Sequence, residues 1–294
     1  MRFCFIIEKE YRNNPMPRVV ADQLVQWGNI VDLLEPQETV VCLSDMHFKG
    51  YDAYVLKTVA GGPGLSILEA AEAAGIATIN NVRAIRLVRN KAVAATYAHA
   101  HGLPMPLTYF VTHLDLLKQV PLEIYPLVVK PNNGSSCRDI YRVNSPADLD
   151  ALVIAKKNEN FFLAQRYVEN RGFDIKVYVI GREVYAVAKK SPLHGNITEK
   201  LIPLTPEMHK LALDTGRIFG LDIYGIDLVE SPQGLVMLDI NDFPSFGYVP
   251  GAVRRVAEYI LHAVERVESK NSVRFGHRKR HRQTTLKKML QIVR

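Results

Sequence analysis

Short apolar runs alternate with amphipathic stretches along the first 83 residues. The apolar runs have the length of strands, whereas the amphipathic stretches repeat their apolar residues at helical spacing. Strands are expected at 2–8, 30–34 and 51–57, and helices at 18–27 and 65–74. Because alternating strands and helices form parallel sheets covered by helices, the pattern predicts a small α/β domain at residues 1–83.

The pattern changes from about residue 84 onward. A helical stretch is followed by the breaker Gly102–Pro106, and then by short apolar runs separated by turns. The elements expected here are helices at 84–100, 207–219 and 253–267, and strands at 107–111, 126–130, 140–143, 161–168, 174–180, 183–189, 225–229 and 235–241. Hairpin-rich sheet between helices is an α+β arrangement, so the chain is predicted to combine α/β and α+β parts.

Composition places the chain among globular proteins, with 294 residues, of which 48% are hydrophobic and 23% charged. No apolar run reaches the roughly 18 to 20 residues that span a bilayer, and the apolar start is too short for a signal peptide. Cys4, Cys42 and Cys137 are far apart and form no CxxC pair, which argues against a disulfide framework and a structural zinc site. We therefore expect a cytoplasmic protein that does not enter a membrane.

The net charge of +7 is concentrated at the C-terminus. Residues 269–294 include nine basic and no acidic residues, and subtracting nine from +7 leaves −2 for residues 1–268. This basic tail is either a solvated end or an arm that binds an anionic partner such as nucleic acid.

Two carboxylates and an amide lie in the predicted strand pair at 225–241. Asp239 and Asn241 are two residues apart on one strand and therefore share a face, and a turn brings Asp227 of the neighbouring strand alongside. Three hard oxygen ligands suit Mg²⁺, which takes its other ligands from water and substrate phosphates. The alternative is ordinary strand-end carboxylates, but both acids lie in apolar runs where an unpartnered charge is costly.

Lysines in predicted strands form a second group of candidates. Lys130 closes one apolar strand and precedes the turn-rich loop 131–136, whose backbone N–H groups could surround a phosphate. Lys176 and Lys189 belong to one predicted hairpin. Each lysine taken singly is equally consistent with a solvated strand edge.

A glycine turn at Gly61–Gly64 opens the helix predicted at 65–74. Free N–H groups at a helix start attract anions, but this turn lacks the GxGxxG spacing and the lysine of a Walker loop. Such a sequence more often forms a simple strand-to-helix turn than an anion-binding site.

Together, the motifs resemble those of the ATP-grasp superfamily over residues 84–268. They stand in the family's order: Asn90-Lys91, Val128-Val-Lys-Pro, Gln165-Arg-Tyr-Val, Asp174-Ile-Lys-Val-Tyr-Val, Gly225-Ile-Asp and Leu238-Asp-Ile-Asn. The resemblance implies an ATP-grasp fold with a pre-ATP-grasp substrate domain at 1–83. A central lobe at 84–163 and a C-terminal lobe with the metal site at 164–268 would grip ATP, and the basic tail at 269–294 would follow.

The resemblance also implies roles for individual residues. Lys91 and Lys130 match the phosphate-binding lysines, and Ser135 lies in the loop expected to cover the phosphates. The other implied residues are Gln165, Arg166, Tyr167 and Val168 at the adenine hinge, Asp174 at the nucleotide, and Asp227, Asp239 and Asn241 as ligands of Mg²⁺, with Mn²⁺ as an alternative ion. The loop at Gly61–Gly64 is expected to face this site.

Two branches of the superfamily share these motifs. RimK-type ligases activate a carboxylate as an acyl phosphate and join an amine to it, but they usually have arginine where Lys176 stands. Inositol polyphosphate kinases resemble the chain in Lys176 and Lys189, but their histidine-bearing loop is replaced by one with Arg138. Since residues 1–268 show no great excess of cations for a polyphosphate ligand, the ligase is preferred, with Lys176, Lys189 and Arg138 as the candidate catalytic residues.

A third class of function stays open. The sheets could be a scaffold for a non-catalytic nucleotide- or nucleic-acid-binding protein that uses the basic tail, although such a scaffold has little use for the three oxygen ligands. For an enzyme, the expected partners are a small-molecule or peptide substrate and, as in many ATP-grasp ligases, further copies of the chain. Loop 190–194 is expected at the mouth of the site, His194 is expected at the surface, and Phe243 either closes the pocket or packs in the core.

Overall fold

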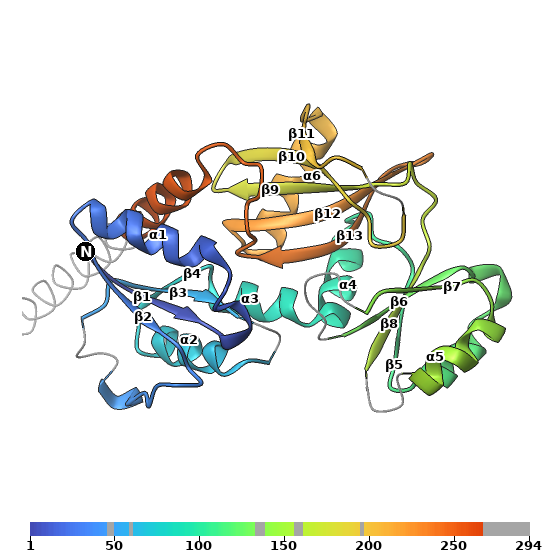
Figure 1. Ribbon diagram of the computed structural model, residues 1–294, viewed down its shortest axis with the longest axis horizontal. Coiled ribbons are helices and arrows are strands. Elements are labelled where there is room, and N and C mark those ends of the chain that lie inside the picture. The colour runs from blue at the N-terminus through green and yellow to red at the C-terminus, as the bar shows by residue number, and fades with distance from the viewer. Residues whose placement is uncertain (46–49, 59–60, 133–138, 156–160, 195–196, 267–294) are drawn as a thin grey trace, which may run out of the picture.

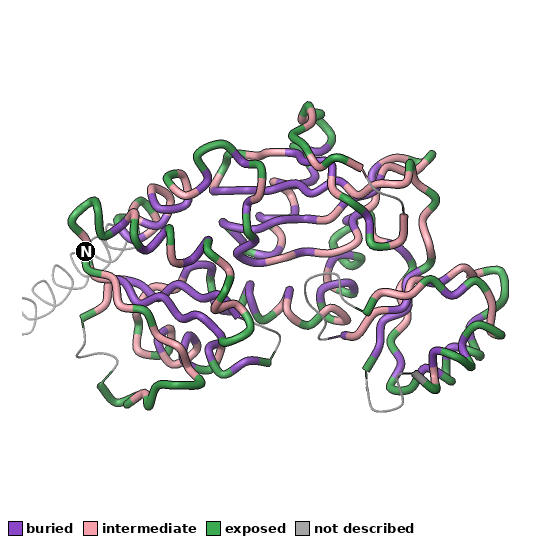
Figure 2. Tube along the Cα trace, viewed as in Figure 1, coloured by how far each residue is buried: buried purple, intermediate pink, exposed green. Residues whose placement is uncertain are grey.

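The computed structural model describes residues 1–45, 50–58, 61–132, 139–155, 161–194 and 197–266. Three sheets organise these residues, and in Figure 1 the five-stranded sheet lies across the two four-stranded ones. Figure 2 shows buried residues following the strands of all three sheets. No helix in these ranges is long and apolar enough to cross a membrane. The basic tail at 269–294 lies outside the described residues.

The N-terminal sheet is parallel, as predicted, with strand order β2-β1-β3-β4. Its elements are β1 (Arg2–Ile7), β2 (Ile30–Leu34), β3 (Ala53–Lys57), β4 (Ala77–Ile79), α1 (Pro15–Gln26) and α2 (Pro63–Ala73). Side chains of β1 alternate between the two helices, because residues two apart on a strand share a face. Phe3 and Phe5 pack in the same core as α1, whereas Cys4 and Ile6 pack in the same core as α2.

The helix expected at 84–100 is two helices, α3 (Val82–Arg89) and α4 (Lys91–Ala100). Asn90 separates them with an extended backbone, and its side chain caps α4 by accepting a hydrogen bond from the N–H of Val93 at 3.3 Å. The single-helix prediction is therefore wrong, because a cap residue in mid-stretch offers the backbone a new helix start.

The central sheet is antiparallel, in the order β5-β8-β6-β7. Its elements are β5 (Thr108–Val111), β6 (Leu127–Pro131), β7 (Tyr141–Val143), β8 (Phe162–Arg166) and α5 (Leu149–Ala155). Strand β8 runs across the boundary placed at 163 and ends at the hinge segment. Short 3-10 turns lie at η1 (Lys9–Tyr11), η2 (Leu43–Asp45), η3 (Leu114–Gln119), η4 (Leu122–Ile124) and η5 (Pro146–Asp148).

The third sheet is also antiparallel, in the order β11-β10-β9-β12-β13. Its elements are β9 (Asp174–Ile180), β10 (Glu183–Lys189), β11 (Lys200–Ile202), β12 (Ile223–Ser231), β13 (Gly234–Asp242) and α6 (Pro206–Phe219). One face of the sheet packs with α6, and the other packs with the helix at 252–266. The short edge strand β11 has no counterpart in the sequence prediction.

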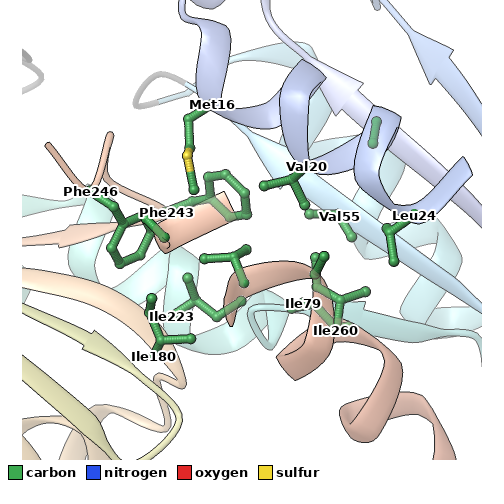
Figure 3. Packing of buried hydrophobic residues seen from close by; sticks show 14 of the residues in the cluster. Met16, Val20, Leu24, Val55, Ile79, Ile180, Ile223, Phe243, Phe246 and Ile260 are labelled. Atoms are coloured by element: carbon green, nitrogen blue, oxygen red, sulfur yellow. The ribbon is translucent and has the colours of Figure 1, made fainter. Parts of the chain in front are cut away.

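One hydrophobic core joins the N-terminal sheet to the five-stranded sheet. Figure 3 shows Met16, Val20 and Leu24 of α1 facing Ile223 of β12 and Ile260 of the last helix. The buried amide of Asn80 fastens the same junction, since it donates to the Ile223 carbonyl at 2.6 Å and accepts from the Ile223 N–H at 2.8 Å. The N-terminal domain is therefore held against the strands that carry the candidate metal ligands.

Candidate active site

One cavity of about 420 Å³ receives residues from all three sheets. Every predicted site residue that the structure describes lines it. These residues are Lys91, Lys130, Gln165, Arg166, Tyr167, Val168, Asp174, Lys176, Lys189, Asp227, Asp239 and Asn241. Ser135 and Arg138 lie outside the described residues, so the loop expected over the phosphates is not part of this description.

The three predicted metal ligands meet where β12 pairs with β13. Asp227 stands opposite Asp239 in the strand register, and Asn241 donates its Nδ2 to Asp227 Oδ2 at 2.8 Å. On the other side of β12, Lys176 Nζ lies 2.7 Å from Asp227 Oδ1. Gly225 leaves room for this lysine, because a Cβ there would stand 3.0 Å from Lys176 Cε.

The two phosphate-binding candidates, Lys91 and Lys130, both contact β13 at or next to Asp239. Its carboxylate forms an ion pair with Lys91, the first residue of α4, while Lys130 Nζ donates to the neighbouring Leu238 carbonyl at 3.0 Å. Burial by itself would raise the pKa of Asp239, but the positive charges of Lys91 and Lys130 hold this pKa well below its usual range. The group is therefore a carboxylate at neutral pH.

The donor set fits a magnesium ion. Two carboxylates and one amide supply hard oxygens, and each of the two carboxylates already binds a positively charged ammonium group. No group of three or more histidine, cysteine, aspartate or glutamate residues that could hold a metal occurs among the described residues, so this candidate set depends on the amide of Asn241 as its third oxygen ligand. Asp227, Asp239 and Asn241 are thus the best-supported candidates for a metal site.

Asp174 lies at the start of β9 on the cavity wall. Burial raises the pKa of Asp174 to about 6, a hydrogen bond with Ser191 opposes the shift, and the negative charge of Asp227 adds to it. The loop after β10 follows the same wall, because residues 190–194 all line the cavity. His194, expected at the surface, is half-buried on the cavity wall, where its Nε2 lies 3.0 Å from the hydroxyl oxygen of Tyr167.

The N-terminal domain and α3 contribute residues that the sequence analysis missed. Tyr11, Asn14 and Lys57 line the cavity although they are distant in sequence from the motifs, and Arg89, which directly precedes the Asn90-Lys91 motif, lines it as well. Lys57 ends a buried strand and Lys130 is the last residue but one of another, and this likeness is the one signal that could have found Lys57. Counted over the described lining residues, eight lysines and arginines face four aspartates, so the cavity has an excess of positive charge that the overall charge concealed.

The glycine turn does not contribute to the cavity: none of the described residues Gly61–Gly64 is among its lining residues. The start of α2 instead binds a carboxylate of the chain itself, since the N–H of Gly64 donates to Glu8 Oε1 at 2.6 Å. Thr58 Oγ1 donates to the same oxygen at 3.0 Å. The expectation that this loop faces the site is therefore wrong, because Glu8 supplies the anion that such a helix start attracts.

Phe243 follows β13 directly and is packed in the core rather than at the pocket. Its neighbours Pro244 and Ser245 line the cavity in its place. Of the two interpretations offered for Phe243, core packing is the one that the structure supports.

Solved ATP-grasp structures share this architecture. The D-alanine–D-alanine ligase from *Bacillus anthracis* complexed with ATP aligns with a TM-score of 0.71 at 15% identity, covering 92% of this chain and 99% of that one. The ATP-grasp ligase PsnB complexed with minimal precursor, Mg and ADP aligns with a TM-score of 0.65 at 16% identity, covering 89% and 98%. At these identities the likeness establishes the ATP-grasp fold.

Sequence relatives point to one branch of that fold. A probable alpha-L-glutamate ligase of *Vibrio cholerae* is 27% identical over 246 residues, which are 76% of this chain and 80% of the relative. Another from *Parasynechococcus marenigrum* is 28% identical over 218 residues, and this match spans 69% of the chain but only 46% of the relative. The RimK-like ATP-grasp domain matches residues 78–250. More than half of the sequence, including all three candidate metal ligands, lies in that match, and the chain therefore belongs to the RimK-like ATP-grasp family of ligases.

Proposed function

We propose that the cavity is the active site of a Mg-ATP-dependent ligase that joins a carboxylate to an amine through an acyl phosphate. The observation that carries the proposal is the meeting of three oxygen ligands with Lys91, Lys130 and Lys176 on one wall. Phosphoryl transfer depends on positive charge and on the positioning of the reactants more than on covalent catalysis by the protein. This arrangement supplies both.

The nucleotide would lie between the central sheet and β13. The segment Gln165–Val168 continues β8 into the cavity, and its backbone is fixed by hydrogen bonds from Arg166 N–H to Leu107 O at 2.9 Å and from Tyr167 N–H to Pro126 O at 2.8 Å. A fixed segment of this kind can present its edge to adenine. Lys91 and Lys130 would then offset the charge of the phosphates.

Asp227, Asp239 and Asn241 would hold the magnesium ion, which supplies charge neutralisation for the phosphate groups when bound. In the first step an oxygen of the substrate carboxylate forms a bond to the γ-phosphorus, and the bond from that phosphorus to the ADP oxygen breaks. In the second step the nitrogen of the neutral amine attacks the acyl carbon, the carbon–oxygen bond to phosphate breaks, and the proton lost by the nitrogen passes to the departing phosphate. Lys176, kept in place by Asp227, offsets the charge that develops on the transferred group.

The names of the relatives suggest one substrate. Because they are called probable alpha-L-glutamate ligases, we include L-glutamate as the amine of the proposed reaction. A peptide is a reasonable carboxylate donor, since PsnB has been solved with its precursor peptide. The eight cations of the cavity would also suit an inositol polyphosphate, which keeps the kinase as the second candidate.

The experiment is an ADP- and phosphate-release screen of the purified protein with Mg-ATP. One panel holds amino acids with carboxylate-ended peptides, and the other holds inositol phosphates. ADP release that needs both a carboxylate and an amine, with an equal amount of free phosphate, supports the ligase. ADP release with inositol phosphates and no free phosphate would overturn it in favour of the kinase.

A further inference from the structure

Lys57 is a buried cation on the wall of the cavity. It is the last residue of β3, only 6% of its surface is exposed, and it lines the cavity from the N-terminal domain. Its ammonium donates a hydrogen bond to the carbonyl of Phe243 and lies 4.6 Å from the centre of the Tyr11 ring. A lysine ammonium has three N–H donors, so this environment leaves two for another partner.

No carboxylate of the described residues forms an ion pair with Lys57. Asp242, whose negative charge raises the pKa of Lys57, is itself paired with Arg89 at 2.6 Å. In contrast, Lys91, Lys176 and Lys189 each pair with a carboxylate of the chain. A buried ammonium that forms no direct ion pair is costly, and burial lowers the pKa of Lys57 to about 7, although the negative charge of Asp242 opposes this shift. An anion brought by a ligand would offset this cost.

The order of contacts along β13 tells which ligand reaches Lys57. Lys130 contacts the strand at Leu238 and Lys91 at Asp239, whereas Lys57 contacts it at Phe243. The extended strand from Leu238 to Asp242 spans about 13 Å, so the backbone contact of Lys57 lies well along β13 from that of Lys130. Of the candidate metal ligands on β13, Asp239 is itself the contact of Lys91, and Asn241 lies between that contact and the one made by Lys57. A group that reacts at the metal site and extends away from ATP would point toward Lys57.

We propose that Lys57 binds a carboxylate of the amine substrate and thereby makes the enzyme select an amino acid over a simple amine. This inference rests on the proposed ligase function. Glu8 supports the position of Lys57, because its backbone N–H donates to the Lys57 carbonyl at 3.0 Å while its own carboxylate is occupied by Gly64 and Thr58. Lys57 is thus held by its strand, and its ammonium is available to the cavity.

The test compares Lys57→Met, Lys57→Arg and the wild type with three amine probes: L-glutamate, L-glutamine and L-isoglutamine. The two amides each lack one carboxylate of glutamate. For Lys57→Met we expect KM for L-glutamate to rise about 10- to 100-fold, the value of a charge-assisted hydrogen bond, with KM for ATP unchanged. Lys57→Arg keeps the charge and should recover part of the loss. Lys9→Met, an exposed lysine of the same domain, is the matched control.

The amides provide the readout that a merely structural role would not give. In the wild type, KM for one of the two amides should exceed KM for glutamate by about the factor by which Lys57→Met raises KM for glutamate. That amide should lose nothing further in the variant, because the contact is already gone. The assignment would be overturned if KM for each amide exceeded KM for glutamate by the same factor in the wild type and in Lys57→Met. An unchanged KM for glutamate in Lys57→Met would also overturn it.

Equilibrium dialysis with labelled L-glutamate separates this inference from the reaction. Suppose that the wild type binds glutamate, that Lys57→Met does not, and that the wild type releases no ADP with any carboxylate and amine. This result would support the subsite and refute the ligase. Ligase turnover with binding unaffected by Lys57→Met would do the reverse. Wild-type turnover of inositol phosphates with a Lys57-dependent KM would overturn the carboxylate as the bound group.

Discussion

Lys91, the first residue of α4, forms an ion pair with Asp239 of β13, so a helix start and a sheet edge 148 residues apart in sequence are joined inside the cavity. The break at Asn90 makes this possible, because it points the new helix start at the strand. The two groups belong to the phosphate-binding and metal-binding candidates respectively. Each therefore fixes the other before any ligand arrives.

Replacing Lys91 by methionine should weaken both ATP binding and folding. The variant loses one phosphate contact and leaves Asp239 with less compensating charge, although Lys130 remains nearby. We expect KM for ATP to rise at least about tenfold and the free energy of unfolding to fall by roughly 1–3 kcal/mol. Urea unfolding and ATP-dependent ADP release measure the two effects. Lys118→Met removes an exposed pair with Asp150 and should change neither.

Asp239→Asn tests the metal assignment separately. The amide keeps the shape of the side chain but loses its charge, so turnover at saturating ATP should fall at least about a hundredfold and the Mg²⁺ concentration needed for half-maximal rate should rise. The measurement is a Mg²⁺ titration of ADP release. Asp150→Asn, on the surface, is the control. Full turnover by Asp239→Asn at unchanged Mg²⁺ would remove Asp239 from the site.

The sequence was informative where chemistry depends on local spacing. Asp239 and Asn241 could be placed on one face because a strand repeats every two residues, and the hairpin brought Asp227 to them. Lys57 could not be placed, because only the packing of α1 against Ile223 and the last helix brings the N-terminal domain to the cavity. The contact between Glu8 and the glycine turn could not be predicted either, because it joins Glu8 to Gly64, 56 positions away in sequence.

Asp174 should make stability depend on pH in the direction opposite to an ordinary paired carboxylate. Its folded-state pKa of about 6 lies above the unfolded value of 3.8, so the native state binds the proton more tightly. The ionised group therefore costs stability above pH 6, and the cost disappears as the pH falls toward 4. Asp174→Asn should then stabilise the fold at pH 7.5, by at most about 3 kcal/mol, and have little effect at pH 4.

Urea unfolding of Asp174→Asn and wild type at these two pH values measures the difference. The asparagine keeps a hydrogen-bonding group for Ser191, so the comparison isolates the charge. A variant that is less stable than the wild type at pH 7.5 would show that the Asp174 carboxylate is stabilised by its surroundings, contrary to the raised pKa.

Gly225→Ala should damage the reaction while sparing the fold. The new methyl would stand 3.0 Å from Lys176 Cε and 3.4 Å from Pro244 Cγ, and the flexible lysine is the partner that can move. Its displacement would disturb the contact with Asp227, which lies 2.7 Å away. We expect kcat to fall at least about tenfold, because a charge-assisted contact to the transferred group is lost, while the free energy of unfolding changes by no more than about 1 kcal/mol. Gly247→Ala, where a methyl meets nothing within 4 Å, is the matched control. A variant with wild-type kcat would mean that the contribution of Lys176 to the reaction does not depend on its contact with Asp227.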